Sequence, residues 1–194
     1  MNFFQAIILG IVQALTEYLP VSSSAHIRII GDLMLGADPG AAFTAIIQIG
    51  TELAVILYFR RDIINILSHW FGCLFGKNGP DWRARMGRGD KYATLGWNVI
   101  VGSIPIIILG FTLQNIIETS LRNLWITVTV LFLFGLLLWI VDARSRQIKT
   151  MDDMNYRDAF LFGLGQSMAL IPGVSRSGGT ITVGRALGYT RESA

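Results

Sequence analysis

Three long apolar runs dominate this chain of 194 residues and restrict what it can fold into. They span residues 43–59, 93–111 and 124–141, and each approaches the roughly 20 apolar residues that a helix needs to cross a bilayer. A buried core can hide one such run, but three in this length argue against a soluble protein. Hydrophobic residues are 52% of the chain, charged residues 15%, and the mean hydropathy is +0.52, so we predict an integral membrane protein.

Composition also excludes several classes of function. The net charge is +3, but the basic residues lie beside the apolar runs rather than among aromatic residues on a polar face, so we expect no nucleic-acid partner. Cys73 is the single cysteine, which excludes a disulfide framework or a cysteine-based metal site within the chain.

One polar motif interrupts the apolar sequence twice. Residues 13–26 read QALTEYLPVSSSAH, and residues 166–180 read QSMALIPGVSRSGGT. A shift of 153 positions without a gap places Gln13 on Gln166 and Ser22 on Ser175. Polar segments broken by Gly or Pro at matching places in two halves of a membrane protein predict one central site built from both.

The charged loop at about residues 60–91 sets the expected topology. It carries an excess of Lys and Arg, so the positive-inside rule places it in the cytoplasm. The run 93–111 then leads outward to a short loop holding Glu118 and Arg122, and 124–141 returns inward. If the repeats are inverted, residues 6–35 form a re-entrant helical hairpin that turns near residues 20–24, whereas parallel repeats would make a full crossing.

We therefore predict an all-α, polytopic membrane protein with inverted-topology repeats and re-entrant hairpins. Residues 1–194 form a single membrane domain, with a first repeat at about 1–62 and a second, incomplete repeat that starts at about 156. The counterpart of Phe43 would fall at position 196, so we expect a longer native protein.

The second copy of the motif has the composition of a phosphate cradle. Glycines such as Gly173 let backbone N–H groups approach an anion, and a helix that resumes after the motif would add its positive end. Arg176 offers bidentate recognition of phosphate oxygens. The alternative is a simple turn whose arginine reaches the membrane interface. The candidate hydroxyl donors are Ser175, Ser177 and Thr180.

The first copy contributes an acid and a base. Glu17 lies in an apolar segment, where a carboxylate is costly and functional use is the default hypothesis. It can hold a divalent cation together with phosphate oxygens, orient His26, accept a proton, or merely pair with Arg176. Gln13 lies four residues earlier on the same helix face. His26 follows Ser22 and Ser23 closely enough to activate a hydroxyl or water, or to serve only as a hydrogen-bonding residue.

Gln48 and Glu52 share one helix face in the run 43–59. Glu52 is a second carboxylate in an apolar segment, and it either lines the cavity or makes a hydrogen bond between helices. His69, beside Trp70 and Phe71, is expected to pack at the membrane interface.

Both motifs resemble those of the bacterial undecaprenyl-diphosphate phosphatases, the membrane phosphatases of bacitracin resistance. The resemblance rests on Gln13 and Glu17, on residues 20–23 with His26, and on residues 172–180. Two separated motifs in the right order make it specific, and it covers essentially the whole chain. Gln13 stands where many members have Glu, which places a two-carboxylate metal site in doubt.

The resemblance implies hydrolysis of a C55 polyprenyl diphosphate to the monophosphate and phosphate, which recycles the lipid carrier for peptidoglycan synthesis. It implies a catalytic set of Glu17, Ser23, His26 and Arg176, supported by phosphate-binding residues and by Mg²⁺ or Ca²⁺ held by Glu17 and Gln13. It also implies a multi-pass protein of the bacterial cytoplasmic membrane whose site faces outward. The supporting phosphate-binding set is Ser22, Gly173, Ser175, Ser177 and Thr180.

Two mechanisms and two other functions stay open at this stage. Ser23 either attacks the terminal phosphorus or only positions an attacking water. A lipid-phosphate flippase or transporter would use the same inverted-repeat anion site without cleaving a bond. A structural subunit of a membrane complex would need these residues only for folding, and a homodimer is one assembly we consider.

Overall fold

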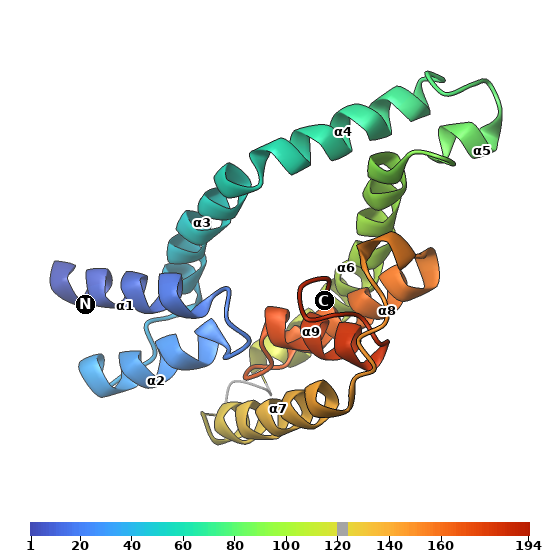
Figure 1. The fold of residues 1–194 in the computed structure, drawn as a ribbon. Coiled ribbons are helices and arrows are strands. Elements are labelled where there is room, and N and C mark those ends of the chain that lie inside the picture. The colour runs from blue at the N-terminus through green and yellow to red at the C-terminus, as the bar shows by residue number, and fades with distance from the viewer. Residues whose placement is uncertain (120–123) are drawn as a thin grey trace.

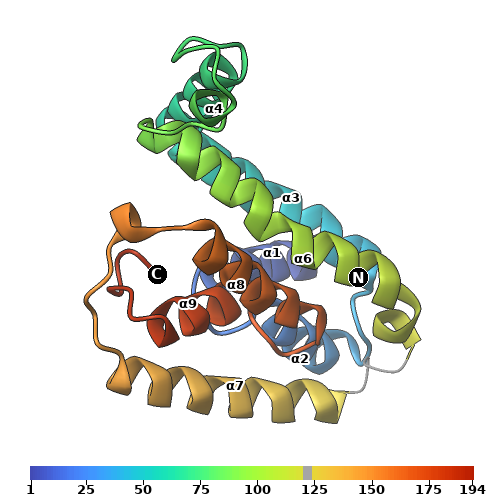
Figure 2. The same cartoon turned by 90° about the vertical axis from the view of Figure 1, so that its right-hand side faces the viewer.

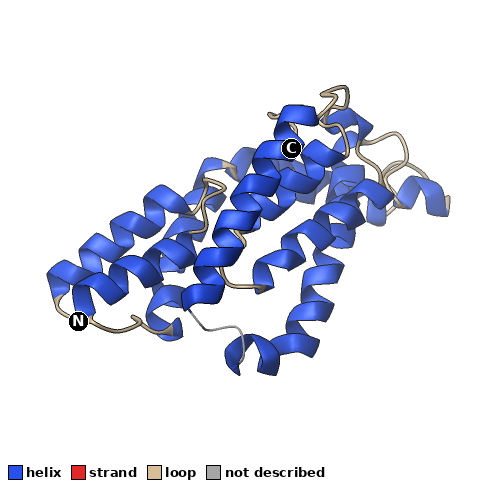
Figure 3. Ribbon diagram, turned by 90° about the horizontal axis from the view of Figure 1, so that it is seen from below, coloured by secondary structure: helices blue, strands red, loops and turns tan. Residues whose placement is uncertain are grey.

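The computed structural model describes residues 1–119 and 124–194, and helices account for most of them (Figures 1 and 3). No strand occurs among the described residues; the only bridge there pairs Lys149 with Tyr189. The all-α prediction is therefore confirmed. The helices are α1 (Phe3–Thr16), α2 (Ser23–Leu35), α3 (Ala41–Tyr58), α4 (Arg60–Leu74), α5 (Trp82–Arg85), α6 (Lys91–Thr119), α7 (Leu124–Arg144), α8 (Tyr156–Ser167) and α9 (Arg176–Ala186), with 3-10 turns η1 (Met151–Asp153) and η2 (Met168–Leu170).

The predicted apolar runs form the long helices. Lys91–Leu113 within α6 and Leu124–Arg144 are each long and apolar enough to cross a membrane. Helix α3 meets that criterion only together with α4, and the two are bent by 71° at Phe59. The charged residues that follow Phe59 end the apolar segment there. The expected outer loop differs, because α6 continues to Thr119, and Arg122 lies outside the described residues.

Two helical hairpins carry the repeated motif. α1 packs against α2, and α8 packs against α9 (Figure 2). At 14 residues, α1 is about 21 Å long, which is less than the hydrocarbon core of a bilayer, about 30 Å thick. Both hairpins turn where the motif predicts, and each is too short to span. Their entry and exit on one membrane face remains a prediction.

Glycines allow close contact around the second hairpin. A Cβ added at Gly163 of α8 would lie 2.1 Å from the carbonyl oxygen of Gly102 in α6. A Cβ added at Gly179 of α9 would lie 2.3 Å from the carbonyl oxygen of Gly165. Small residues at helix contacts let backbones approach closely, which is the common mode of packing in membranes. These contacts fix α8 and α9 against α6 and thereby fix the turn between them.

Polar contacts hold the far end of α9. Arg185 is fully buried, its Nε donates to Asp142 Oδ1 of α7 at 2.6 Å, and its NH1 donates to the Tyr189 carbonyl at 2.7 Å. The Tyr189 hydroxyl donates to Asp158 Oδ2 at 2.7 Å, and Lys149 Nζ lies 2.8 Å from the same oxygen. Breaking such a buried pair by removing one partner is costly, so this end of the hairpin is rigid.

Asp90 ties α4 to the start of α6. Its Oδ2 lies 2.8 Å from His69 Nδ1, and its Oδ1 accepts the Ala93 N–H at 3.1 Å. His69 also lies beside Tyr92, so it does more than pack at the interface as expected. Partial burial raises the pKa of Asp90, but the hydrogen bonds from His69 and Ala93 outweigh it and hold the pKa below its ordinary value.

We expect Asp90→Asn to loosen the α4–α6 contact by about 1–2 kcal/mol at pH 7, because hydrogen bonds to a charged group are lost. A carboxylate whose folded-state pKa is lowered stabilises the fold above its unfolded pKa, about 3.9, and this stabilisation is lost as the pH falls through the lower folded value. Thermal melting followed by tryptophan fluorescence measures this loss of stability, since Trp70 of α4 and Trp97 of α6 are in contact with each other. Asp81→Asn, in the same loop, should leave the melting curve unchanged; equal melting of both variants would contradict the prediction.

Candidate active site

The turns of the two hairpins meet (Figure 1). The Ser177 hydroxyl donates to the Leu19 carbonyl at 3.0 Å, and the Arg176 guanidinium donates to the Glu17 carboxylate. These partners lie 158 and 159 residues apart in sequence. The two copies of the motif therefore contribute to one place in the fold.

Glu17 lies at the centre of this place. Its Oε2 accepts the Gln13 Nε2 at 2.7 Å and the Ser23 hydroxyl at 2.5 Å, while its Oε1 accepts Arg176. The side chain is only 13% exposed. A carboxylate that accepts a serine hydroxyl and is compensated by a guanidinium is placed to take the serine proton.

A cavity of about 330 Å³ surrounds this cluster. Both copies of the motif line it, and α3 and α6 complete its wall. Arg176 is the only cationic side chain among its described lining residues. The lining is Gln13, Glu17, Ser22, Ser23, Ser24, Thr44, Gln48, Ile106, Ala169, Leu170, Val174, Ser175 and Arg176.

Two helices begin at the cavity. α2 begins at Ser23 after Ser22, a buried residue with a positive φ of 62°, and α9 begins at Arg176 after Ser175. The Ser175 hydroxyl accepts the Gly178 N–H at 3.2 Å, as an N-cap residue does. The first N–H groups of a helix have no acceptor within the helix, and its dipole is positive there. Two such ends and one arginine make this cavity favourable for an anion.

Gly173 holds the second turn against α7. Its φ is +103°, and an added Cβ would lie 2.4 Å from the Thr127 carbonyl oxygen. Only glycine satisfies both demands. Gly173 lines a neighbouring cavity of about 280 Å³ rather than the one around Glu17. Its place is in the scaffold of the turn.

His26 also faces the neighbouring cavity. Its Nδ1 lies 2.9 Å from the Ser22 carbonyl oxygen, one helical turn earlier. The Ser23 hydroxyl donates to Glu17, whereas His26 contacts the Ser22 carbonyl. Of the two residues expected to activate Ser23, the structure therefore places only Glu17 in hydrogen-bond contact with it. Ser175 lines both cavities and connects the His26 side to the Glu17 side.

Thr180 lies apart from the other motif residues. Its hydroxyl donates to the Arg176 and Ser177 carbonyls of its own helix, both at 3.0 Å, and the residue lines a third cavity with Asn98 and Gln166. The Ser177 hydroxyl donates to the Leu19 carbonyl, and its oxygen lies 2.8 Å from the Ser175 hydroxyl oxygen. Ser177 thus joins the two hairpins, whereas Thr180 stabilises the first turn of α9.

Residues outside the motif complete the cavity. Thr44 and Gln48 of α3 line it, and Glu52 Oε1 lies 3.9 Å from Arg176 NH1. The sequence placed Gln48 and Glu52 on one face but did not indicate Thr44 or Ile106. Helix periodicity could have indicated Thr44 as a lining residue, because it precedes Gln48 by four residues and so shares its helix face.

The described residues contain no cluster of three or more His, Cys, Asp or Glu side chains that could hold a metal ion. The Gln13 side chain is 1% exposed, and its Oε1 is buried without a hydrogen-bond partner while its Nε2 donates to Glu17. Amide and carboxylate oxygens are the ligands that Mg²⁺ and Ca²⁺ prefer. The donor set therefore fits a hard cation that takes its remaining ligands from phosphate and water.

The chain matches the model of the family described as "Bacitracin resistance protein BacA" over residues 6–194. It belongs to this family. Curated relatives named undecaprenyl-diphosphatase are similar to all 194 residues, with 89% identity in Bifidobacterium longum subsp. infantis and 72% in Bifidobacterium adolescentis. One from Paenarthrobacter aurescens is 54% identical over 198 residues and is covered to 68% of its length.

The chain spans 66% of the length of the Bifidobacterium relatives that it matches. Family membership and the apolar helices together identify a multi-pass membrane protein. The duplicated motif is part of the matched region, since both hairpin turns lie within residues 6–194.

Proposed function

We propose that this protein hydrolyses undecaprenyl diphosphate to undecaprenyl phosphate and inorganic phosphate. The proposal rests on one observation. The Glu17 carboxylate accepts hydrogen bonds from both Ser23 and Arg176, the first residues of α2 and α9. The relatives' shared name, undecaprenyl-diphosphatase, supports the same reaction. The product would serve again as lipid carrier for peptidoglycan synthesis, and its supply would confer bacitracin resistance.

Arg176 and the N-terminal amides of α2 and α9 would hold the terminal phosphate. Phosphoryl transfer depends mainly on positioning and on neutralising charge at the transferred group. The guanidinium pairs bidentately with phosphate oxygens, and helix N-termini add partial positive charge. The hydroxyls of Ser22 and Ser175 lie at the same ends and would donate further hydrogen bonds.

Ser23 would then act as the nucleophile. Its Oγ gives its proton to Glu17 Oε2 and forms a bond to the terminal phosphorus, while the bond from that phosphorus to the bridging oxygen breaks and undecaprenyl phosphate leaves. Water then attacks the phosphorus of the phosphoserine, the bond from phosphorus to Ser23 Oγ breaks, this oxygen takes back from Glu17 the proton that it gave, and phosphate is released. His26 would accept a proton from this water through Nε2, because its Nδ1 faces the Ser22 carbonyl.

Gln13 Oε1 and Glu17 would hold Mg²⁺ or Ca²⁺. When bound, this cation would neutralise charge on the diphosphate. Gln13 is suited to this role as a neutral ligand, because it supplies an oxygen without adding a second negative charge beside the substrate. Glu17 would be the one carboxylate that holds the cation.

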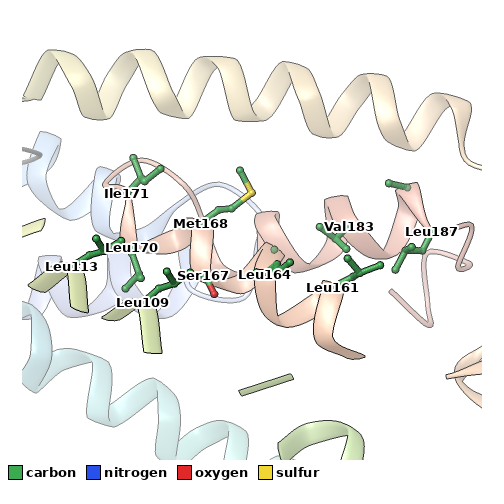
Figure 4. A pocket seen from close by; sticks show the side chains of 12 residues that line it. Leu109, Leu113, Leu161, Leu164, Ser167, Met168, Leu170, Ile171, Val183 and Leu187 are labelled. Carbon is green, nitrogen blue, oxygen red and sulfur yellow. The ribbon is translucent and has the colours of Figure 1, made fainter. Parts of the chain in front are cut away.

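An apolar groove beside the cavity supports a lipid substrate. It has a volume of about 580 Å³ and lies between α6, α8 and α9 (Figure 4). Leu170 lines both the groove and the Glu17 cavity, so apolar and polar regions adjoin. A polyprenyl chain would lie in the groove while its diphosphate occupies the cavity. The membrane would be the cytoplasmic membrane, with the site open to its outer side.

Phosphate release from undecaprenyl diphosphate by the purified protein in detergent tests the function. We expect catalytic release that falls by about 10²-fold or more when EDTA removes divalent cations and returns on adding Mg²⁺ or Ca²⁺. Release unaffected by EDTA would remove the metal from the mechanism. Folded protein that binds the diphosphate and moves it across vesicles without releasing phosphate would replace the hydrolase by a flippase.

A further inference from the structure

Two Gln–Glu pairs, one at the end of α1 and one in α3, converge on one arginine. Gln13 Nε2 of α1 donates at 2.7 Å to Glu17, the residue directly after this helix, and Gln48 Nε2 donates to Glu52 Oε1 on α3 at 3.2 Å. Each glutamine precedes its glutamate by four residues, so each pair occupies one face of its helix. Glu17 and Glu52 both contact Arg176, the first through NH2 and the second through NH1.

The partners of Glu17 and Glu52 differ. Glu17 also accepts Ser23 and, in the proposed reaction, takes its proton, which neutralises the carboxylate that holds Arg176. Glu52 is 57% exposed, and its contacts are with Gln48 and Arg176. Neither contact supplies a proton from a serine hydroxyl, so the proton transfer proposed for Glu17 does not involve Glu52. The guanidinium retains one anionic partner at the step where its position matters most.

We propose that Glu52 is a positioning residue that holds the Arg176 guanidinium in the cavity while Glu17 is protonated or occupied by a cation. This inference rests on the proposed phosphatase reaction. An exposed pair at 3.9 Å is worth little in water. On α3, however, the neighbours of Glu52 are exposed apolar residues such as Ile49 and Leu53, and a carboxylate in an apolar segment is costly unless it is paired. Pairing with Arg176 meets that need.

The test compares Glu52→Gln, Glu52→Asp and the control Asp62→Asn, which removes a carboxylate from the first turn of α4. We expect E52Q to lower kcat by about tenfold to 10²-fold, since a misplacement of about 1 Å in a catalytic group has an effect of this size. KM should stay within about twofold, because removing a negative charge beside the site does not weaken anion binding. E52D should restore part of kcat, and D62N should match the unaltered protein.

A double-mutant cycle separates positioning from a merely structural role. Combined with Glu17→Gln, E52Q should lower residual phosphate release by a larger factor than it does alone, because Arg176 then has neither carboxylate. Equal kcat in E52Q and the unaltered protein would overturn the proposal, and so would an E52D variant that folds but is no better than E52Q. If the unaltered protein released no phosphate, the proposed function itself would fail, and the two failures are thus distinguished.

Discussion

Arg176→Ala should reduce phosphate release from undecaprenyl diphosphate by about 10³-fold or more. Arginines that stabilise the transferred phosphoryl group are worth about 10³–10⁵ in turnover. Arg176 is the only cationic side chain among the described residues that line the cavity, so no neighbour can replace it. Its loss also leaves Glu17 without its counter-ion, which adds a repulsive charge beside the substrate.

Arg176→Lys and Arg191→Ala serve as comparisons. Lysine keeps the charge but not the planar pair of donors, so R176K should recover only part of the lost rate. R191A also removes an arginine from an ion pair, with Asp142, but Arg185 continues to hold that carboxylate. R191A should therefore keep near-normal turnover. Release by R176A within about fivefold of the unaltered protein would contradict the assignment of this site, given the expected magnitude.

The broad architecture could be predicted because hydropathy is a local property of the sequence. The runs 93–111 and 124–141 became α6 and α7 with extended ends, since length and composition suffice to define an apolar helix. The direction of α4 could not be predicted. Its bend at Phe59 depends on backbone geometry and on packing against α6, neither of which hydropathy records.

The meeting of the two motifs could also be predicted, because repeated polar breaks need each other to satisfy their charges. The Glu17–Arg176 pair, 159 residues apart, is the direct result. The partner of each hydroxyl could not be predicted from spacing. Ser23 and His26 lie three residues apart, yet the Ser23 hydroxyl donates a hydrogen bond to Glu17, and His26 Nδ1 lies within hydrogen-bond distance of the Ser22 carbonyl oxygen. Thr180 likewise bonds back to its own helix, as threonines within helices often do.

Glu17→Gln should reduce phosphate release by about 10²–10⁴-fold, the usual range for loss of a general base. The amide nearly preserves the shape of the side chain but cannot take the proton of Ser23 or compensate Arg176. Glu192→Gln is the matched control, since it makes the same change at an exposed position near the end of the described chain. Its turnover should equal that of the unaltered protein.

The combination of Glu17→Gln with Arg176→Ala decides whether the two residues act as a unit. Groups that cooperate in one chemical step show strongly non-additive losses, so the double variant should be little worse than R176A alone. Multiplied losses would mean that Glu17 and Arg176 serve separate steps despite their contact. An E17Q variant with normal turnover would leave Ser23 without the acceptor that the structure gives it, and attack by the Ser23 hydroxyl with Glu17 as base would be excluded.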